Sequence, residues 1–181
     1  MIAKKPDMAK TREVHLILDN IRSVHNVGSI FRTAETLGIN KIYCIGTTPT
    51  PLDRFGRKRK DLAKVALGAE DILEWEHVGD LGSGSGTTGA AALIKKLKKD
   101  GFKIVALEQS PRSVDYKDIK IKNGAKGVPK IAIILGNEVD GVSAKLLKSA
   151  DVIAEIPMLG QKESLNVSVA GAVFLFRLLD R

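Results

Sequence analysis

The chain has 181 residues, a hydrophobic content of 44% and a formal net charge of +8 at pH 7. This length is enough for one domain with a substantial core, and the composition is typical of a soluble globular protein. The sequence shows no signal peptide and no apolar run long enough to cross a membrane, so we expect a cytoplasmic protein with no membrane partner. The excess positive charge favours a polyanionic partner, although it also serves solubility.

Cysteine and histidine usage argues against a disulfide framework and against a metal centre. The single Cys44 lies in an apolar run and has no second cysteine to pair with, so we expect a buried, packed thiol. The three histidines, His15, His25 and His77, lie far apart and lack the spacing of metal ligands. The sequence therefore predicts no metal site.

Short apolar runs alternate with segments of helical periodicity along the whole chain. Residues 1–12 are polar and basic and are predicted to form a flexible arm, and 13–181 are predicted to form a single domain. The run 131–135 is short and wholly apolar, as expected for a strand buried on both faces of a parallel sheet. The alternation predicts an α/β fold with a parallel sheet and helices on both faces. Strands are predicted at 13–18, 41–45, 71–78, 103–107, 131–135 and 153–157, and helices near 26–37, 59–66 and 165–176.

The first helix is predicted to begin near Asn26 and to end at Gly38. Its apolar side chains recur at helical spacing and define one buried face, which leaves Arg32 on the other side. The members of that face are Val27, Ile30, Phe31, Ala34 and Leu37.

A dense basic cluster follows two prolines in the loop after the second strand. The lysines of 95–99 read as an ordinary solvated helix face, but the cluster lies in or beside a loop, where it favours contact with nucleic acid. The predicted RNA-binding residues are Arg54, Arg57, Lys58, Arg59 and Lys60.

A glycine-rich segment offers an alternative. Gly84-Ser-Gly86-Thr-Thr-Gly89 has the spacing of a dinucleotide-binding loop, precedes a helical segment and lies about 20 residues before Glu108. The segment before it is acidic, however, whereas such a loop normally follows a buried apolar strand. We interpret 82–89 as a spacer and keep a nicotinamide-dependent oxidoreductase as the less favoured alternative.

Two strands near the C-terminus end in polar turns. Gly136, Asn137 and Glu138 follow one strand, at the edge where open α/β sheets bind ligands. The other strand leads through a polar loop to Ser164, which is a suitable N-cap for the last helix. Residues 165–176 carry no charge, so this helix must be buried on most sides. Its small residues, Ser168, Ala170, Gly171 and Ala172, are interpreted as a surface for self-association.

Three blocks in this order resemble the SpoU (TrmH-like) branch of the SPOUT-class RNA ribose 2'-O-methyltransferases. They are Asn26-Val-Gly-Ser-Ile-Phe-Arg32, Gly136-Asn137-Glu138 with Gly141, and Ser164-Leu-Asn166-Val-Ser168. The resemblance implies an α/β knot fold with a C-terminal trefoil knot, and S-adenosyl-L-methionine as methyl donor. It also implies a homodimer with a shared active site, in which the first helix of one subunit reaches the donor pocket of the other.

The resemblance also implies the site residues. Donor contacts would come largely from backbone in the loops after the strands, namely at Leu107, Glu108, Leu135, Gly136, Asn137, Ile156, Pro157, Met158 and Leu165. The implied catalytic residues are Arg32, Asn26, Glu138, Ser164 and Asn166.

The role implied for Arg32 is activation of the ribose hydroxyl. An arginine is normally never deprotonated, so electrostatic stabilisation of a developing alkoxide, or a clamp on the adjacent phosphate, is physically easier than base catalysis. Asn26, Glu138 and Ser164 have structural explanations too, because each is able to cap a helix. Asn166 has no such obvious structural role.

The predicted function is transfer of a methyl group from S-adenosyl-L-methionine to a ribose 2'-hydroxyl of tRNA or rRNA. The first alternative is a non-catalytic RNA-binding module of the same fold. The second is the oxidoreductase built on Gly84–Gly89.

Overall fold

A computed structural model of the chain describes residues 12–79, 87–120 and 128–180. They form a seven-stranded sheet with the order β3-β2-β1-β6-β4-β7-β5, and every pair of neighbouring strands is parallel. The predicted parallel α/β sheet is thus confirmed. The strands are β1 (Glu13–Asp19), β2 (Lys41–Ile45), β3 (Glu74–Val78), β4 (Lys103–Leu107), β5 (Val114–Asp115), β6 (Lys130–Leu135) and β7 (Val152–Glu155). The helices are α1 (Val24–Leu37), α2 (Lys60–Ala66), α3 (Ala69–Ile72), α4 (Thr87–Lys99), α5 (Ala144–Ser149) and α6 (Val167–Leu178), with a 3-10 helix η2 (Tyr116–Asp118).

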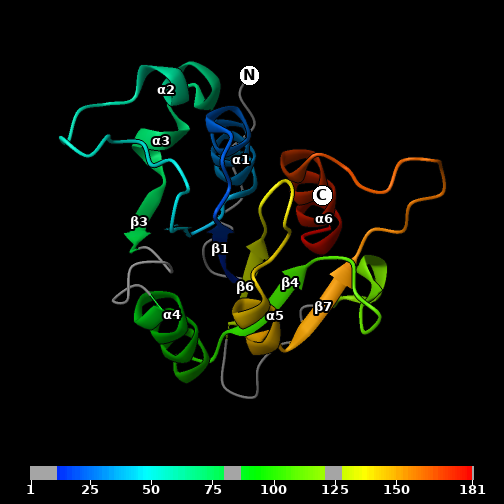
Figure 1. The fold of residues 1–181 in the computed structure, drawn as a ribbon. Helices are drawn as coiled ribbons and strands as arrows, with labels where there is room; N and C mark the ends of the chain where they lie inside the picture. Colours follow the sequence, from blue (N-terminus) through cyan, green and yellow to red (C-terminus); the bar gives the residue numbers. More distant parts are fainter. Residues whose placement is uncertain (1–11, 80–86, 121–127, 181) are drawn as a thin grey trace, which may run out of the picture.

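Helices cover both faces of the sheet, also as predicted. Side chains of α1, α2, α3 and α6 share one buried cluster with alternate residues of the central strands. Side chains of α4 and α5 share a second cluster with the remaining strand residues. Figure 1 shows the first group of helices above the sheet and the second group below it. The central strands are buried on both faces, which explains their unbroken apolar sequences.

The first helix ends at Gly38 as predicted, but α1 and α6 begin at other residues than predicted because other side chains act as N-caps. The N-cap of α1 is Ser23, whose side chain accepts a hydrogen bond from the backbone N–H of Asn26, so Asn26 lies within the first turn. Asn166, and not Ser164, caps α6 by accepting from the backbone N–H of Ser168. Asn166 therefore has the structural role that the sequence did not reveal.

Two further predictions need correction. Residues 71–72 belong to α3, so the strand predicted from residue 71 begins only at Glu74. Of the small residues of α6, Gly171 does not face outward, because it is buried and a Cβ there would lie 2.9 Å from Cδ1 of Leu135, whereas Ser168, Ala170 and Ala172 are half-buried. Gly171 allows α6 to approach its own sheet closely, and the exposed side of α6 is apolar instead.

Cys44 is buried in β2, as expected, and burial raises the pKa of its thiol to about 12. Trp75 is partly buried and packs against the larger core cluster. In the part of the chain that the structure describes, no helix has the length and apolar character needed to cross a membrane.

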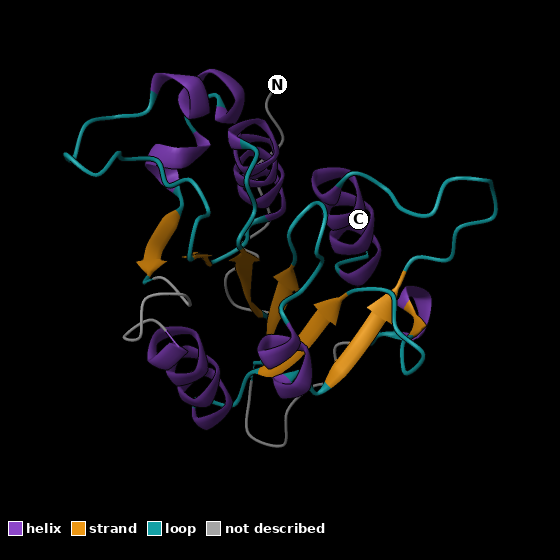
Figure 2. Ribbon diagram, in the orientation of Figure 1, coloured by secondary structure: helices purple, strands orange, loops and turns teal. Residues whose placement is uncertain are grey.

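Long loops leave the sheet at the edge where the central strands end (Figure 2). The arrowheads of β6, β4 and β7 point toward this edge in Figure 1. One loop, 46–59, projects beside α2 and α3, and another, 156–166, connects β7 to α6. Ligands of open parallel sheets bind at such an edge, so the side chains gathered there are described next.

Candidate active site

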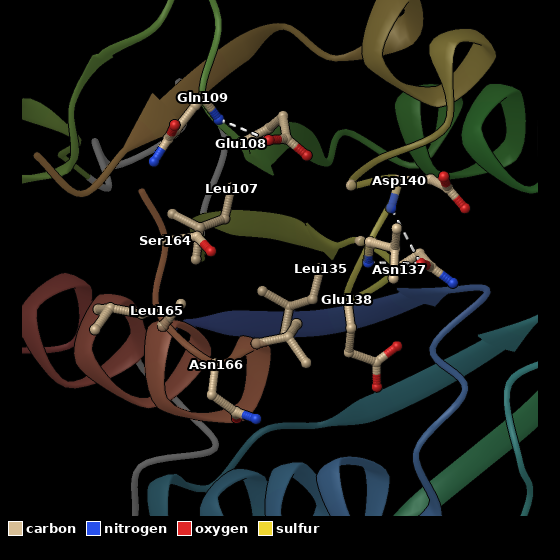
Figure 3. Close-up of a pocket in the computed structure, with 15 residues that line it drawn as sticks. Leu107, Glu108, Gln109, Leu135, Asn137, Glu138, Asp140, Ser164, Leu165 and Asn166 are labelled. Carbon is tan, nitrogen blue, oxygen red and sulfur yellow. Dashed lines mark hydrogen bonds between the residues drawn. The ribbon is translucent and has the colours of Figure 1, made fainter. Parts of the chain in front are cut away.

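A cavity of about 490 Å³ lies at the carboxyl ends of β4 and β6. Its walls come from three stretches that are far apart in the sequence: the end of β4, the turn after β6, and the loop that enters α6 (Figure 3). Leu107, Leu135 and Leu165 give it apolar walls, and the turn after β6 contributes backbone groups. The volume and the mixture of apolar walls with a few polar groups suit a small organic ligand.

The turn 136–142 is held from two sides by side chains. Asn137 accepts hydrogen bonds at Oδ1 from the backbone N–H groups of Val139 and Asp140, at 2.8 and 3.1 Å. From the end of β4, the carboxylate of Glu108 accepts one from the backbone N–H of Val142 at 2.7 Å. Both Glu108 and Asn137 thus shape the turn before any ligand arrives, so these two predicted binding residues have a structural role as well.

Gly136 is required by the closeness of this turn to itself. A Cβ at Gly136 would overlap the backbone of Gly141 and Val142. The family resemblance implies that the backbone at Gly136 contacts the donor. The structure shows that Gly136 first leaves room for the chain's own backbone.

Three of the predicted catalytic residues meet in one hydrogen-bond network at the rim of the cavity. The Asn26 side-chain amide donates to Oε1 of Glu138 at 2.8 Å, and the Asn166 amide donates to Oδ1 of Asn26 at 3.0 Å. Glu138 also accepts from the backbone N–H groups of Arg22 and Ser23, at 3.0 and 3.1 Å. The network joins α1, the turn after β6 and the start of α6.

The environment of Glu138 keeps its carboxylate ionised. Partial burial acts to raise the pKa of Glu138, but hydrogen bonds from the backbone N–H of Arg22 and the side chain of Asn26 outweigh it, so the pKa lies below its usual range. Glu138 does not cap α5, whose N-cap is Ser143. It lies instead beside the N-terminus of α1, where the helix dipole favours a negative charge.

We expect Glu138→Gln to lower the free energy of unfolding by about 0.5–1.5 kcal/mol near neutral pH, because an amide N–H₂ would then face backbone donors. Since the folded pKa of Glu138 is depressed, its contribution is present above the unfolded pKa of about 4.3 and is lost as the pH falls through the folded value. Urea unfolding at neutral and acid pH measures both effects. Asp140→Asn, on the same turn but outside this network, is the control, and an equal loss in both variants would contradict the prediction.

Arg32 lies on the exposed side of α1 and does not line the cavity. Six residues separate it from Asn26, which corresponds to about 9 Å along the helix and a turn of about 240° around it. The two side chains therefore leave α1 in different directions. Within one chain, the structure brings together Asn26, Glu138 and Asn166 but leaves Arg32 apart from them.

The predicted donor-binding residues divide into two groups. Six of them line the cavity, together with Ser164, whereas the three residues that follow β7 do not. The lining residues are Leu107, Glu108, Leu135, Gly136, Asn137 and Leu165. The residues outside the lining are Ile156, Pro157 and Met158.

Sequence reasoning missed several lining residues. Two of them, Val139 and Asp140, lie between Glu138 and Gly141, which the sequence analysis had already named. The turn had only to be extended to Gly141 to include them. Gln109 lies next to Glu108, and its side chain donates to the backbone carbonyl of Glu163 at 2.6 Å, which ties the end of β4 to the loop before α6. Nothing in the local sequence indicated this long-range contact. Ala170 and Val167 complete the wall from α6.

Acidic neighbours partly neutralise the basic cluster at 54–60. Arg57 pairs with Asp53 at 2.8 Å and Arg59 with Asp61 at 2.9 Å. Lys58 pairs with both Glu70 and Asp71. Among the described residues, Arg54 and Lys60 form no ion pair. The positive field of this cluster is therefore weaker than the sequence alone indicates.

The glycine-rich alternative falls mostly outside the described residues, since 80–86 are not among them. What the structure describes is α4, which begins at Thr87 and is followed by β4.

Comparison with known proteins identifies relatives of this site and fold. Residues 13–176 match the model of the SpoU rRNA Methylase family. The chain is 30% identical over 174 residues to a tRNA (guanosine(18)-2'-O)-methyltransferase of Borreliella burgdorferi, covering 95% of this chain and 68% of that protein. It is also 30% identical over 160 residues to the 23S rRNA (guanosine-2'-O-)-methyltransferase RlmB of Neisseria meningitidis, covering 88% of this chain and 55% of that one.

Solved structures share the fold. An AdoMet-bound rRNA methyltransferase of Sinorhizobium meliloti superposes with a TM-score of 0.75 at 25% identity, covering 91% of this chain and 55% of that one. The TrmH/SpoU tRNA modifying enzyme of A. aeolicus gives a TM-score of 0.73 at 26% identity, covering 94% and 77%. The chain thus spans little more than half the length of several of the proteins it matches.

Proposed function

The chain belongs to the SpoU rRNA methylase family, and from that premise we propose that it transfers a methyl group from S-adenosyl-L-methionine to a ribose 2'-hydroxyl of RNA. The observation that carries this proposal is the cavity at the ends of β4 and β6, rimmed by the network of Asn26, Glu138 and Asn166. A relative named as a tRNA methyltransferase and one named as a 23S rRNA methyltransferase are each 30% identical to the chain, so the proposal covers either RNA.

The residues of the cavity fit the proposed donor. The donor has an aromatic base, a ribose and a charged amino-acid end, and it supplies a methyl group on a positively charged sulfur. Leucine side chains from β4, β6 and the loop before α6 offer apolar surfaces for the base. Glu108 and Asn137 hold the turn after β6 in place, so its backbone groups are already oriented for a ligand.

The 2'-hydroxyl must lie in line with the methyl group, and its proton must leave as the new bond forms. Arg32 provides a fixed positive charge that stabilises the alkoxide developing at the hydroxyl oxygen, or holds the adjacent phosphate. Asn26 and Asn166 position α1 against α6, and Glu138 holds Asn26 in turn. In this scheme Glu138 is a positioning residue and not a proton acceptor.

The homodimer expected from the sequence is also part of this proposal. It is supported by an apolar stripe on the exposed side of α6, formed by Val169, Val173 and Phe176, which are 47%, 38% and 41% exposed. These residues lie at helical spacing, opposite the side that packs on the sheet. A two-fold contact through this stripe would bury it. That Arg32 of one subunit then reaches the cavity of the other is what the family resemblance implies.

We expect Val173→Glu to raise the dissociation constant of the dimer by about 100-fold or more, because the contact would then bury an unpaired charge. Sedimentation velocity over a range of concentrations measures this shift. Ile72→Glu, at an apolar position on α3 that is 71% exposed, is the matched control and should leave association unchanged. A dimer of undiminished strength in Val173→Glu would show that α6 is not the interface.

The proposal also includes RNA contact by the basic cluster, with its members now distinguished by their ion pairs. The cluster consists of Arg54, Arg57, Lys58, Arg59 and Lys60. The ion pairs of Arg57 and Arg59 are at least partly exposed, and exposed pairs are individually worth about 0–1 kcal/mol. These two residues are therefore able to exchange an acidic partner for a phosphate, whereas Lys58 also pairs with the buried carboxylate of Glu70. Arg54 and Lys60 are the first candidates for phosphate contact. The knotted path of the C-terminal segment likewise remains a proposal.

The decisive experiment is transfer of labelled methyl from S-adenosyl-L-methionine to fractionated RNA, followed by mapping of the modified nucleotide. Label retained at a ribose 2'-oxygen supports the proposal. A thermal shift with S-adenosylhomocysteine but no transfer to any RNA fraction would favour a non-catalytic RNA-binding module. A shift with NAD and none with S-adenosylhomocysteine would overturn the assignment in favour of an oxidoreductase.

A further inference from the structure

The tip of the loop between β2 and α2 is ordered by a single carboxylate. Asp53 accepts hydrogen bonds from the backbone N–H groups of Phe55 and Arg57, at 2.8 and 2.9 Å, and from Nε of Arg57 at 2.8 Å. An antiparallel bridge between Leu52 and Lys58 closes the loop behind the tip. The conformation at Phe55 is therefore fixed before any partner binds.

This tip presents an aromatic ring to solvent. Phe55 is 65% exposed, and its ring centroid lies 4.7 Å from the guanidinium carbon of Arg54 and 4.9 Å from that of Arg57. By contrast, Phe31 and Phe174 are fully buried in the core. The exposed ring and the two guanidinium groups that lie over it offer planar surfaces on which a flat, electron-rich group is able to stack.

A second cavity, of about 620 Å³, lies between this tip and the base of the loop. Its lining includes three threonines together with Phe55, Arg57 and Arg59, and the carboxylates of Asp53 and Asp61 that pair with these arginines. Its size suits a nucleotide-sized group, and its lining combines hydroxyl groups, an aromatic ring and guanidinium groups.

The base of this loop is hydrogen-bonded to residues 18–21, which directly precede the residues that hold Glu138. Thr48 donates at Oγ1 to the backbone carbonyl of Leu18 and accepts from the backbone N–H of Ile21, at 2.9 and 3.1 Å. The next residues, Arg22 and Ser23, hold the Glu138 carboxylate at the rim of the first cavity. Because β2 and β6 both flank β1, the two loops leave the sheet about 10 Å apart.

We propose that Phe55, with Arg54 and Arg57, binds an unstacked nucleobase of the RNA close to the nucleotide that is methylated. The proposal rests on the proposed function, because it takes RNA as the substrate. A single-stranded base has an exposed π-face that stacks on the ring, while the guanidinium groups attract the neighbouring phosphate. A base within a duplex is already stacked and is not available to this surface.

The test compares binding of a labelled single-stranded RNA of mixed sequence with binding of the duplex it forms with its complement, by fluorescence anisotropy. Phe55→Leu should weaken single-strand binding by about 5- to 100-fold, since it removes the stacking face but keeps apolar bulk. Phe55→Trp should preserve the affinity or raise it. Neither change alters a charge, so the salt dependence of binding should stay as in the wild type.

Ile72→Ala removes an equally exposed apolar side chain from α3 and is the matched control. Thermal unfolding and the shift with S-adenosylhomocysteine should not change in Phe55→Leu, which separates stacking from a structural role. Equal single-strand affinity in Phe55→Leu and wild type overturns the proposal. An equal loss of affinity for single strand and duplex also overturns it, as does weaker single-strand binding by Phe55→Trp.

The stacking proposal and the proposed function fail in distinguishable ways. If the wild type methylates RNA and Phe55→Leu binds and transfers equally well, only the stacking proposal is wrong. If no RNA fraction is methylated while Phe55→Leu still loses single-strand binding, the stacking surface stands and the methyl-transfer assignment is wrong.

Discussion

Gly136→Ala should reduce methyl-donor affinity by about 100-fold or more, because the added Cβ overlaps the backbone of Gly141 and Val142 and displaces the turn that lines the cavity. Strain of this kind also destabilises a protein by about 1–3 kcal/mol. Isothermal titration with S-adenosylhomocysteine measures the first effect, and urea unfolding measures the second.

Gly79→Ala is the matched control. Gly79 also directly follows a strand, β3, but a Cβ there meets nothing within 4 Å among the described residues. It should leave donor affinity unchanged and shift stability by less than about 0.5 kcal/mol. If Gly136→Ala binds the donor as the wild type does, then the turn after β6 is not part of the donor site.

Arg32→Ala should lower the rate of methyl transfer by about 100- to 1000-fold while leaving donor affinity intact, because it removes the charge proposed to stabilise the transition state. The side chain is exposed in the single chain, so stability should change little. Single-turnover transfer at saturating donor measures the rate. Arg32→Lys keeps a positive charge but lacks the planar guanidinium group. Its rate of methyl transfer should therefore lie between those of the wild type and Arg32→Ala.

A mixing experiment tests whether Arg32 serves the partner's cavity. Chains carrying Arg32→Ala and Gly136→Ala are co-expressed with different tags, and the heterodimer is purified. One of its two sites then combines an intact cavity with an intact Arg32, and the other carries both defects. The heterodimer should recover up to about half of wild-type activity, although both parent homodimers are inactive.

Ala170→Phe provides a second donor-site variant if Gly136→Ala does not fold, because Ala170 lines the cavity from α6 and a ring there would fill it. A folded heterodimer that stays as inactive as its parents would mean that Arg32 acts within its own chain or takes no part in catalysis.

The strands and the sheet type were predictable because each central strand carries its own signal. The predicted β2 and β4 match the observed ones, and β1 and β6 differ from prediction by one residue. These strands are buried on both faces, so each one appears in the sequence as an apolar run along most of its length. Strand β3 lies at the edge of the sheet and is mostly exposed, so its acidic sequence gave no clear start.

Helix caps and long-range contacts were not predictable in the same way. Ser164 and Asn166 are both good N-caps, and the choice between them depends on how α6 packs on the sheet. The bonds from Glu138 to Asn26 and from Asn26 to Asn166 join residues that are 112 and 140 positions apart. No local pattern encodes such contacts, so the resemblance to a family was the only guide to them. The acids that pair with the basic cluster lie close to it in sequence, with Asp53 and Asp71 4 and 13 positions from their partners, so their charges could be read from the sequence but their pairing could not.

The order of the strands places two groups of loops on opposite sides of β1. The turn after β6 and the end of β4 lie on one side, and the loop between β2 and α2 lies on the other, with residues 18–23 between them. A longer, shorter or differently composed β2–α2 loop is therefore free to evolve without disturbing the turn after β6. The fold is in this sense modular, and exchanging 49–59 between relatives offers a direct way to transplant RNA preference while the methyl-transfer chemistry stays in place.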